Sequence, residues 1–315
     1  MKVLVTGGAG FIGSHTVDFL IEQGAEVVIV DDLSRGKKEN INPAANFYPI
    51  DIRSRDIKDL LAGEPVDYVI HLAAQIDVQS SLKEPLFDAS VNILGTLNLL
   101  EACLQSGVKK VVYASSAAVY GEPCYLPVDE KHPVKSQSGY GLSKQVAERY
   151  LALYKALHGL DFSVLRYANV YGPRQDAAGE GGVVAVFADK LLKGDVPEIF
   201  GDGEQTRDFV FAADVARANF LALQKAPGAC MNVSTGEETT VNHLYRTFQD
   251  LLGEEREPRY ARARPGDINK SFLANHLIKE ILNWEPEVTL KEGLRLTLEY
   301  QRERIQQAGA MKKIG

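Results

Sequence analysis

The chain has 315 residues, of which 45% are hydrophobic and 24% charged, and its formal net charge is −7. This size supports one large α/β core with an added lobe, or two modest domains, and the negative charge argues against nucleic acid and anionic membranes as partners. The three cysteines include no Cys-x-x-Cys pair, which predicts a cytoplasmic protein. The histidines show no metal-ligand spacing, and no apolar run is long enough for a membrane segment, so neither a metal nor a membrane is expected.

The first predicted elements are a strand, a glycine-rich turn and a helix. A short apolar run leads into residues 7–13, which read GGAGFIG. Gly7 permits the tight turn, Gly10 lets the backbone approach a pyrophosphate, and Gly13 allows the next helix to pack on the strand. The pattern predicts a bound dinucleotide whose pyrophosphate lies at the amino end of a helix over residues 10–22.

The second predicted strand, residues 26–30, ends at two carboxylates, Asp31 and Asp32. A carboxylate at this position accepts hydrogen bonds from the adenosine ribose hydroxyls and repels a 2′-phosphate. The pair favours NAD as the cofactor, while the nearby Arg35 and Lys37 leave NADP as the alternative.

Strands and helices then alternate, which predicts a Rossmann-type, doubly wound parallel sheet. Further strands are expected at residues 66–72, 110–114 and 162–166, and helices at 85–106 and 140–158. The pattern changes after Pro173. We expect an NAD-binding domain over residues 1–173, with 205–240 returning to it, and a smaller lobe, mostly substrate-binding, within 174–315.

A tyrosine and a lysine lie one helical turn apart at the start of the helix predicted for residues 140–158. Tyr140 and Lys144 therefore share a face. A neighbouring ammonium and a bound nicotinamide cation both favour the phenolate, which makes Tyr140 a candidate base. Ser115 and Ser116 end a strand at the edge where ligands bind in such sheets, so a serine hydroxyl can bond the same substrate oxygen.

Together these motifs identify a family. The chain resembles the extended short-chain dehydrogenase/reductases that act on nucleotide sugars, and among them it is most similar to the UDP-glucose 4-epimerases. The resemblance spans nearly the whole sequence. Its motifs are residues 6–13, 71–74, 115–121, 140–144, 166–173, 201–203, 207–209 and 264–267.

The resemblance implies a reaction at C4 of a UDP-hexose. Tyr140 takes the proton of the 4-hydroxyl, NAD accepts the C4 hydride, Ser116 shares the hydrogen bond, and Lys144 holds the ribose. The keto sugar turns over and hydride returns to its other face, which inverts C4. Related dehydratases carry Asp-Glu where this chain has Ala117-Ala118, and an alanine pair supplies no acid or base for elimination. Ser115 is the alternative to Ser116.

The resemblance also assigns binding residues. The expected cofactor contacts are Gly7, Gly10, Phe11, Ile12, Gly13, Asp31, Asp32, Gly36, Asp51, Ile52, Leu72, Ala73, Ala74, Tyr140 and Lys144. The expected UDP-sugar contacts are Ser116, Tyr140, Asn169, Gly182, Val183, Phe200, Arg207, Arg264, Asp267 and Ser271. Arg207 and Arg264 suit a diphosphate because a guanidinium donates two parallel hydrogen bonds.

Three further expectations follow from the resemblance. The helices at residues 85–106 and 140–158 correspond to those that form a homodimer in the family, and Leu97, Leu100, Leu104, Tyr150 and Tyr154 suggest apolar surface beyond one core-facing stripe. Ser271 occupies a position where tyrosine is associated with excluding N-acetylated sugars, so UDP-GlcNAc and UDP-GalNAc are further expected substrates. A 4-epimerase or 4-ketoreductase of a UDP-uronic acid or dTDP-sugar, and a non-catalytic NAD-binding sensor, remain the alternatives.

Overall fold

The computed structural model describes residues 1–177, 182–263 and 268–311, with 308–311 described by backbone alone. Arg264 and Asp267, two predicted substrate contacts, lie outside the described residues. No helix in the described part of the chain is long and apolar enough to span a bilayer.

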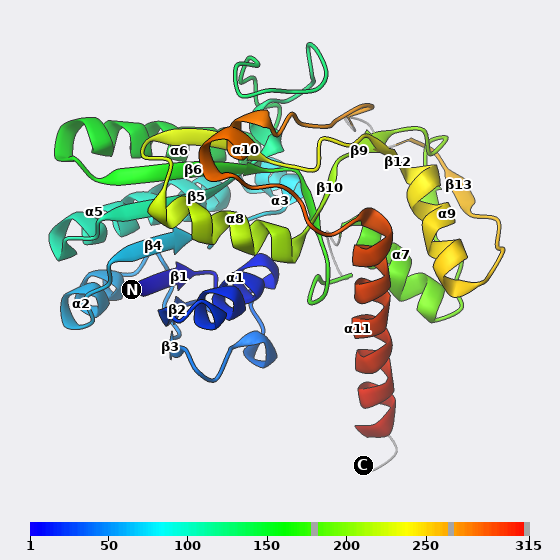
Figure 1. Ribbon diagram of the computed structural model, residues 1–315, viewed down its shortest axis with the longest axis horizontal. Coiled ribbons are helices and arrows are strands. Elements are labelled where there is room, and N and C mark those ends of the chain that lie inside the picture. Colours follow the sequence, from blue (N-terminus) through cyan, green and yellow to red (C-terminus); the bar gives the residue numbers. More distant parts are fainter. Residues whose placement is uncertain (178–181, 264–267, 312–315) are drawn as a thin grey trace.

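A seven-stranded parallel sheet forms the centre of the molecule (Figure 1), which confirms the predicted doubly wound class. Its strand order is β11-β6-β5-β4-β1-β2-β3, so the first six strands have the arrangement of a dinucleotide-binding fold. The strands are β1 (Lys2–Thr6), β2 (Glu26–Val30), β3 (Asn46–Tyr48), β4 (Tyr68–His71), β5 (Lys110–Ser116), β6 (Asp161–Tyr167) and β11 (Ala229–Val233).

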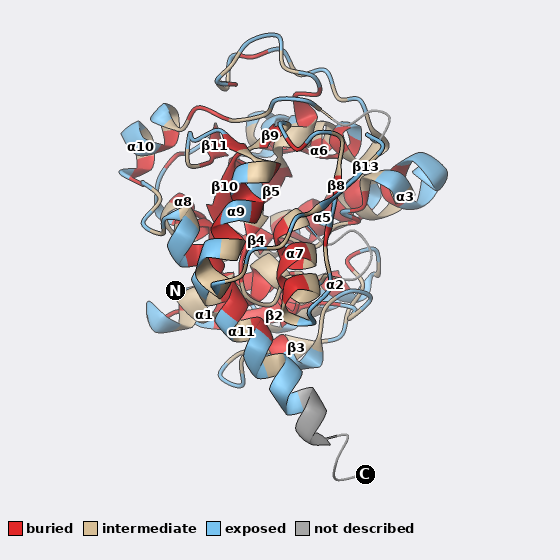
Figure 2. Cartoon of the chain, turned by 90° about the vertical axis from the view of Figure 1, so that its right-hand side faces the viewer, coloured by how far each residue is buried: buried red, intermediate tan, exposed pale blue. Residues whose placement is uncertain are grey.

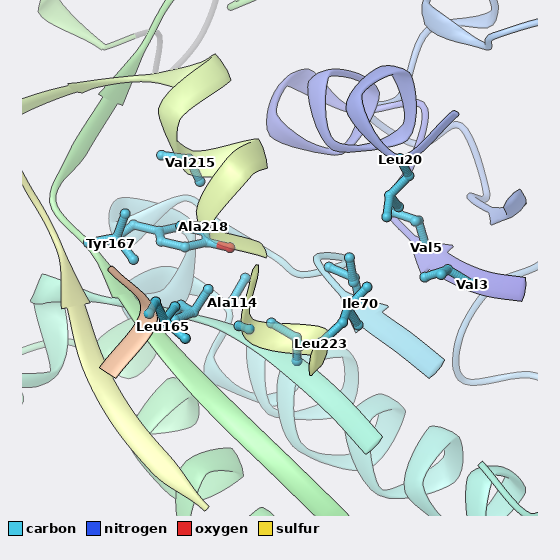
Figure 3. Close-up of a cluster of buried hydrophobic side chains, with 14 of the residues drawn as sticks. Val3, Val5, Leu20, Ile70, Ala114, Leu165, Tyr167, Val215, Ala218 and Leu223 are labelled. Carbon is cyan, nitrogen blue, oxygen red and sulfur yellow. The ribbon is translucent and has the colours of Figure 1, made fainter. Parts of the chain in front are cut away.

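Helices cover both faces of this sheet, because successive strand residues point to opposite sides and both sides are apolar. On one face, Val3, Val5 and Ile70 pack with Leu20 of the first helix, as Figure 3 shows. That face is covered by α1 (Phe11–Glu22), α8 (Ala212–Gln224) and α10 (His276–Leu282). The other face is covered by α2 (Asp56–Gly63), α5 (Thr96–Ser106) and α6 (Gly139–His158).

The predicted helix over residues 85–106 is present but is not regular throughout. It consists of α4 (Pro85–Ala89), a π-helical segment η2 (Ser90–Gly95) and α5, and it follows the short helix α3 (Val78–Lys83). The wider turn brings Asn92 into the interior, where it is 2% exposed. Such π-helical turns are frequent near functional sites, and apolar periodicity gives no sign of them.

The apolar residues cited for a dimer face belong instead to the core. Leu100 and Tyr154 are buried, and Leu97, Leu104 and Tyr150 pack against the same cluster beneath α5 and α6. This corrects the sequence interpretation, since a wide core-facing stripe accounts for all five. The outer sides of the two helical regions carry other apolar residues, namely Leu86, Leu94, Leu142, Leu153 and Leu157, which are exposed.

The chain beyond β6 builds a lobe and also returns to the sheet. β11 pairs with β6 in the main sheet, whereas β10 (Phe209–Phe211) pairs with β7 (Asn169–Tyr171) in a separate two-stranded sheet. Part of the segment 205–240 therefore lies in the sheet and part outside it.

Three helices share the core of this lobe, at the right of Figure 1. They are α7 (Val183–Leu192), α9 (Val241–Leu252) and α11 (Leu290–Met311). Short strand pairs complete it: β8 (Glu198–Phe200) with β13 (Arg259–Ala261), and β9 (Thr206–Arg207) with β12 (Thr239–Thr240). Figure 2 shows the exposed part of α11 extending away from the body. Two 3₁₀ turns, η1 (Lys38–Asn40) and η3 (Ala117–Val119), follow β2 and β5.

Candidate active site

A cavity of about 1120 Å³ lies at the carboxyl edge of the sheet. In open α/β sheets, ligands bind at this edge, outside the carboxyl ends of the strands. Every residue predicted to contact the cofactor lines it. These residues are Gly7, Gly10, Phe11, Ile12, Gly13, Asp31, Asp32, Gly36, Asp51, Ile52, Leu72, Ala73, Ala74, Tyr140 and Lys144.

The glycine turn between β1 and α1 forms one wall of the cavity. Gly7 has a φ of +71°, and a Cβ there would lie 2.7 Å from the Ala73 nitrogen. A Cβ on Gly13 would lie 2.0 Å from the Gly7 carbonyl oxygen, so only glycine lets α1 begin this close to the turn. No side chain caps α1, so its first amide N–H groups are suited to an anion.

The two carboxylates after β2 have different surroundings. Asp31 is buried, and its oxygens accept from the backbone N–H groups of Ala9 and Leu33 at 3.0 and 2.9 Å. Burial raises the pKa of Asp31, and those hydrogen bonds oppose the rise. Asp32 is exposed and accepts from Ser34. Asp31 therefore also shapes the glycine turn, a role that the sequence alone did not reveal.

The two cations that follow Asp32 closely in the sequence are matched by carboxylates. Arg35 lies 3.7 Å from Asp77, and the Lys37 ammonium lies 3.1 Å from Asp176. Both cations line the cavity. Since their charge is already balanced, they give little support to a site for a 2′-phosphate, and the arrangement favours NAD over NADP.

Tyr140 and Lys144 reach the cavity from the first turns of α6. The helix begins after Ser138, whose hydroxyl accepts from the Gly141 N–H at 3.0 Å. The Lys144 ammonium donates to the Ala114 carbonyl at 2.8 Å and lies 5.9 Å from the centre of the Tyr140 ring. Burial lowers the pKa of Lys144 to about 8.

The protein's own groups raise the pKa of Tyr140, whereas the lowering expected from the sequence also includes the charge of a bound nicotinamide. Burial is the main cause, because it disfavours the phenolate, and a hydrogen bond with Ser116 works in the opposite direction. Lys144 is not among the groups that lower this pKa.

The two serines at the end of β5 point to different partners. The Ser115 hydroxyl donates to Glu148 at 2.5 Å, and Glu148 also binds Arg166 at 2.6 Å in a buried ion pair. Ser116 instead interacts with Tyr140 and accepts from the Ala118 N–H at 3.2 Å. This geometry favours Ser116 over Ser115 as the partner of the tyrosine, although only Ser115 is among the residues that line the cavity.

The predicted sugar-nucleotide contacts from the lobe are not gathered in this cavity. Gly182 lines it. Asn169 begins β7, Val183 begins α7, and Phe200 ends β8. Arg207 donates to the carbonyls of Thr206 and Ile268, both at 2.7 Å, and the Ser271 N–H approaches the Thr206 hydroxyl at 3.4 Å. Arg207 and Ser271 are thus brought to one place at β9.

One further residue of the cavity was not predicted from the sequence. Gln75 lines the cavity directly after Ala74, where the motif could have been extended by one residue. Asp208, within the motif at residues 207–209, is buried and accepts from the backbone of Thr235, Gly236 and Leu273, which fixes the segment beside Ser271. Burial raises the pKa of Asp208 to about 6. Among the described residues, no group of three or more His, Cys, Asp or Glu side chains is placed to hold a metal.

The fold and site define a dinucleotide-binding α/β protein with a tyrosine and a lysine beside the cofactor pocket. Residues 3–234 match the NAD dependent epimerase/dehydratase family. The chain belongs to this family.

Individual relatives agree with this assignment. A putative UDP-glucose 4-epimerase from Methanocaldococcus jannaschii is 48% identical over 95% of this chain and 98% of its own length. The crystal structure of UDP-glucose 4-epimerase with UDP-glucose from Thermotoga maritima is 47% identical, with a TM-score of 0.95 over 97% of this chain and 100% of that one. The UDP-glucose 4-epimerase of Thermus thermophilus in complex with NAD is 42% identical, with a TM-score of 0.90 over 96% and 99%.

Proposed function

We propose that the protein is an NAD-dependent epimerase that inverts C4 of a UDP-hexose, interconverting UDP-glucose and UDP-galactose. The observation that carries the proposal is the meeting of Tyr140 and Lys144 with the glycine turn in one cavity, with Ser116 beside the tyrosine. The full-length likeness to UDP-glucose 4-epimerases, including one with UDP-glucose and one with NAD, supports the choice of reaction.

The residues present suit the cofactor, since the cradle at Gly7 and Gly13 is one that a side chain would fill. NAD, when bound, supplies a hydride acceptor and returns the hydride later. Tyr140 removes the proton from the sugar 4-hydroxyl and gives it back, and Ser116 holds the same oxygen by a hydrogen bond. The Lys144 ammonium, which donates to the Ala114 carbonyl, would bind the cofactor ribose and, together with the nicotinamide charge, would favour the phenolate.

The lobe is proposed to hold the UDP half of the substrate, with Arg207 and Arg264 as the diphosphate partners. The remaining proposed contacts are Asn169, Gly182, Val183, Phe200, Asp267 and Ser271. In this division the domain over 1–173, with part of 205–240, carries the cofactor, and the rest of 174–315 carries most of the substrate contacts.

Two experiments separate this proposal from its alternatives. The purified protein should still contain NAD, which denaturation would free for assay. The reason is that a reaction cycle which returns its hydride to the same substrate never needs to exchange the cofactor. A cofactor-free preparation that turns over only with supplied NADPH would reject the proposal and favour a ketoreductase. A panel of UDP- and dTDP-sugars, with the C4 epimers resolved, distinguishes a UDP-hexose from a uronic acid or dTDP-sugar, and turnover of none of them would favour a sensor.

We further propose that the protein is a homodimer through the outer sides of α4, η2 and α6. Leu86, Leu94, Leu142, Leu153 and Leu157 expose between 46% and 86% of their surface there, and such a concentration of apolar residues is typical of an interface. Light scattering at micromolar concentration should return twice the chain mass of 34.6 kDa. If the unmodified protein has the mass of one chain, the dimer is rejected. The Leu153→Glu variant should have the mass of one chain, because a charge is placed in the proposed interface.

A further prediction concerns the sugars that the site accepts. Ser271 is half-buried and far smaller than tyrosine, so an N-acetyl group on C2 is expected to fit beside it. The protein should interconvert UDP-GlcNAc and UDP-GalNAc as well as the unsubstituted pair. Ser271→Tyr should remove the N-acetyl activity and retain the other, whereas Ser271→Ala should retain both. Equal loss on both substrate pairs would show that this residue does not select the sugar.

A further inference from the structure

A buried carboxylate lies behind the wall of the active-site cavity and has no role in the mechanism above. Asp88, on α4, is 2% exposed. Its Oδ1 accepts from the Gln75 side-chain amide at 2.8 Å and from the Asn92 side-chain amide at 3.2 Å. Both partners are neutral, so these bonds engage one oxygen of the carboxylate without cancelling its charge.

The same amides connect Asp88 to the catalytic helix. Gln75 and Asn92 form a reciprocal pair, with the Gln75 N–H donating at 2.8 Å and its carbonyl accepting at 2.9 Å. The Asn92 amide also donates to the Ser143 hydroxyl at 3.0 Å, and that hydroxyl donates to the Tyr140 carbonyl at 3.0 Å. A chain of buried hydrogen bonds therefore joins Asp88 to the turn of α6 that lies between Tyr140 and Lys144.

Resting on the proposed function, we propose that Asp88 is a positioning residue whose negative charge keeps Lys144 cationic and whose amide partners fix the turn that carries Tyr140. An apolar residue would fill the same volume at lower cost, because a buried carboxylate that lacks a directly bound cation must be compensated by hydrogen bonds. The charge of Asp88 acts on Tyr140, which exchanges the proton, and on Lys144, which is proposed to hold the cofactor.

The electrostatic surroundings agree with this role. Burial lowers the pKa of Lys144, and the charges of Asp88 and Glu148 raise it again, in that order of size. The charge of Asp88 also raises the pKa of Tyr140. His71 stays neutral there, since burial lowers its pKa to about 3. The titratable groups that surround the pair are Tyr113 on β5, His71 on β4, Tyr167 on β6 and Glu148 on α6.

The charge of Asp88 raises the pKa of both Tyr140 and Lys144, so its removal should lower both. Asp88→Asn keeps the shape and an acceptor but removes the charge, so both Tyr140 and Lys144 should release their protons at lower pH. The acid limb of the pH profile of turnover, where the tyrosine must lose its proton, should move down. The alkaline limb, where the lysine loses its proton, should move down as well, each by roughly half to one unit.

The test compares Asp88→Asn with Asp88→Glu and with a distant control, Asp161→Asn, at the amino end of β6. Both limbs should shift for Asp88→Asn, and neither should shift for the other two variants. Reduced turnover with unmoved limbs would overturn the proposal, since a purely structural role predicts that result. If Asp88→Asn does not fold, Asp88→Ser, which leaves room for a water, takes its place with the same expected shifts.

A spectroscopic titration of Tyr140 tests the role of Asp88 without requiring turnover of a UDP-sugar. The ultraviolet difference between each protein and its Tyr140→Phe counterpart reports the ionisation of Tyr140 alone. Asp88→Asn should move that ionisation to lower pH even if no UDP-sugar is turned over, in which case the proposed function fails and the role of Asp88 stands. An unmoved titration would reject the role of Asp88 whatever the activity.

Discussion

Replacing Tyr140 with phenylalanine is expected to lower turnover by roughly 10²–10⁴-fold, the range for losing a general acid–base group. The ring is partly buried at the start of α6 and lines the cavity, so the loss of one hydroxyl leaves the packing unchanged. Binding of the UDP-sugar should persist. Steady-state kinetics together with calorimetric titration of UDP measure the two effects separately.

Tyr125→Phe is the matched control. Its hydroxyl bonds to Asp129 on an exposed loop at 2.7 Å, far from the cofactor turn in sequence, so its loss should leave turnover unchanged. Ser116→Ala should reduce turnover less than Tyr140→Phe, because the serine shares the hydrogen bond but does not move the proton. Near-normal turnover of Tyr140→Phe would show that another group is the base.

Gly13→Ala is expected to abolish retention of the cofactor. The added Cβ would lie 2.0 Å from the Gly7 oxygen and 2.8 Å from the Gly8 Cα, both of them backbone atoms of the turn. Since backbone cannot rotate away as a side chain can, α1 must move outward and the amide cradle is lost. The ratio of NAD to protein after purification measures this directly, and the variant should carry almost none.

Gly63→Ala provides the comparison for this prediction. Gly63 ends α2, and a Cβ there would meet nothing within 4 Å, so this variant should retain NAD as the unmodified protein does. Thermal unfolding of both variants separates loss of cofactor from loss of fold. A Gly13→Ala protein that carries a full complement of NAD would show that the turn does not hold the pyrophosphate as described.

The sequence was sufficient for the parts of the molecule whose chemistry is local. Strands that are apolar on both sides, separated by helices, specify a covered parallel sheet, and the glycine turn and the Tyr140–Lys144 spacing are read from adjacent residues. All the predicted cofactor contacts line one cavity because they follow consecutive strands to the same edge.

Long-range placement could not be read in the same way. Packing between α4, η2 and α6 determines the π-helical segment that turns Asn92 inward and the burial of Asp88. Apolar periodicity does not predict such packing. The choice between Ser115 and Ser116 depends on Glu148, which is 33 residues away from Ser115. The sequence predicts the lobe only coarsely, because its short strand pairs join distant segments such as β8 and β13.

The most direct test of the proposed function is to incubate the purified protein with UDP-galactose, without added cofactor, and to resolve the C4 epimers over time. We expect that UDP-glucose appears until the two epimers reach equilibrium, that the same mixture forms from UDP-glucose, and that no net NADH accumulates. Absence of the second epimer from a preparation that contains bound NAD would contradict the proposed function.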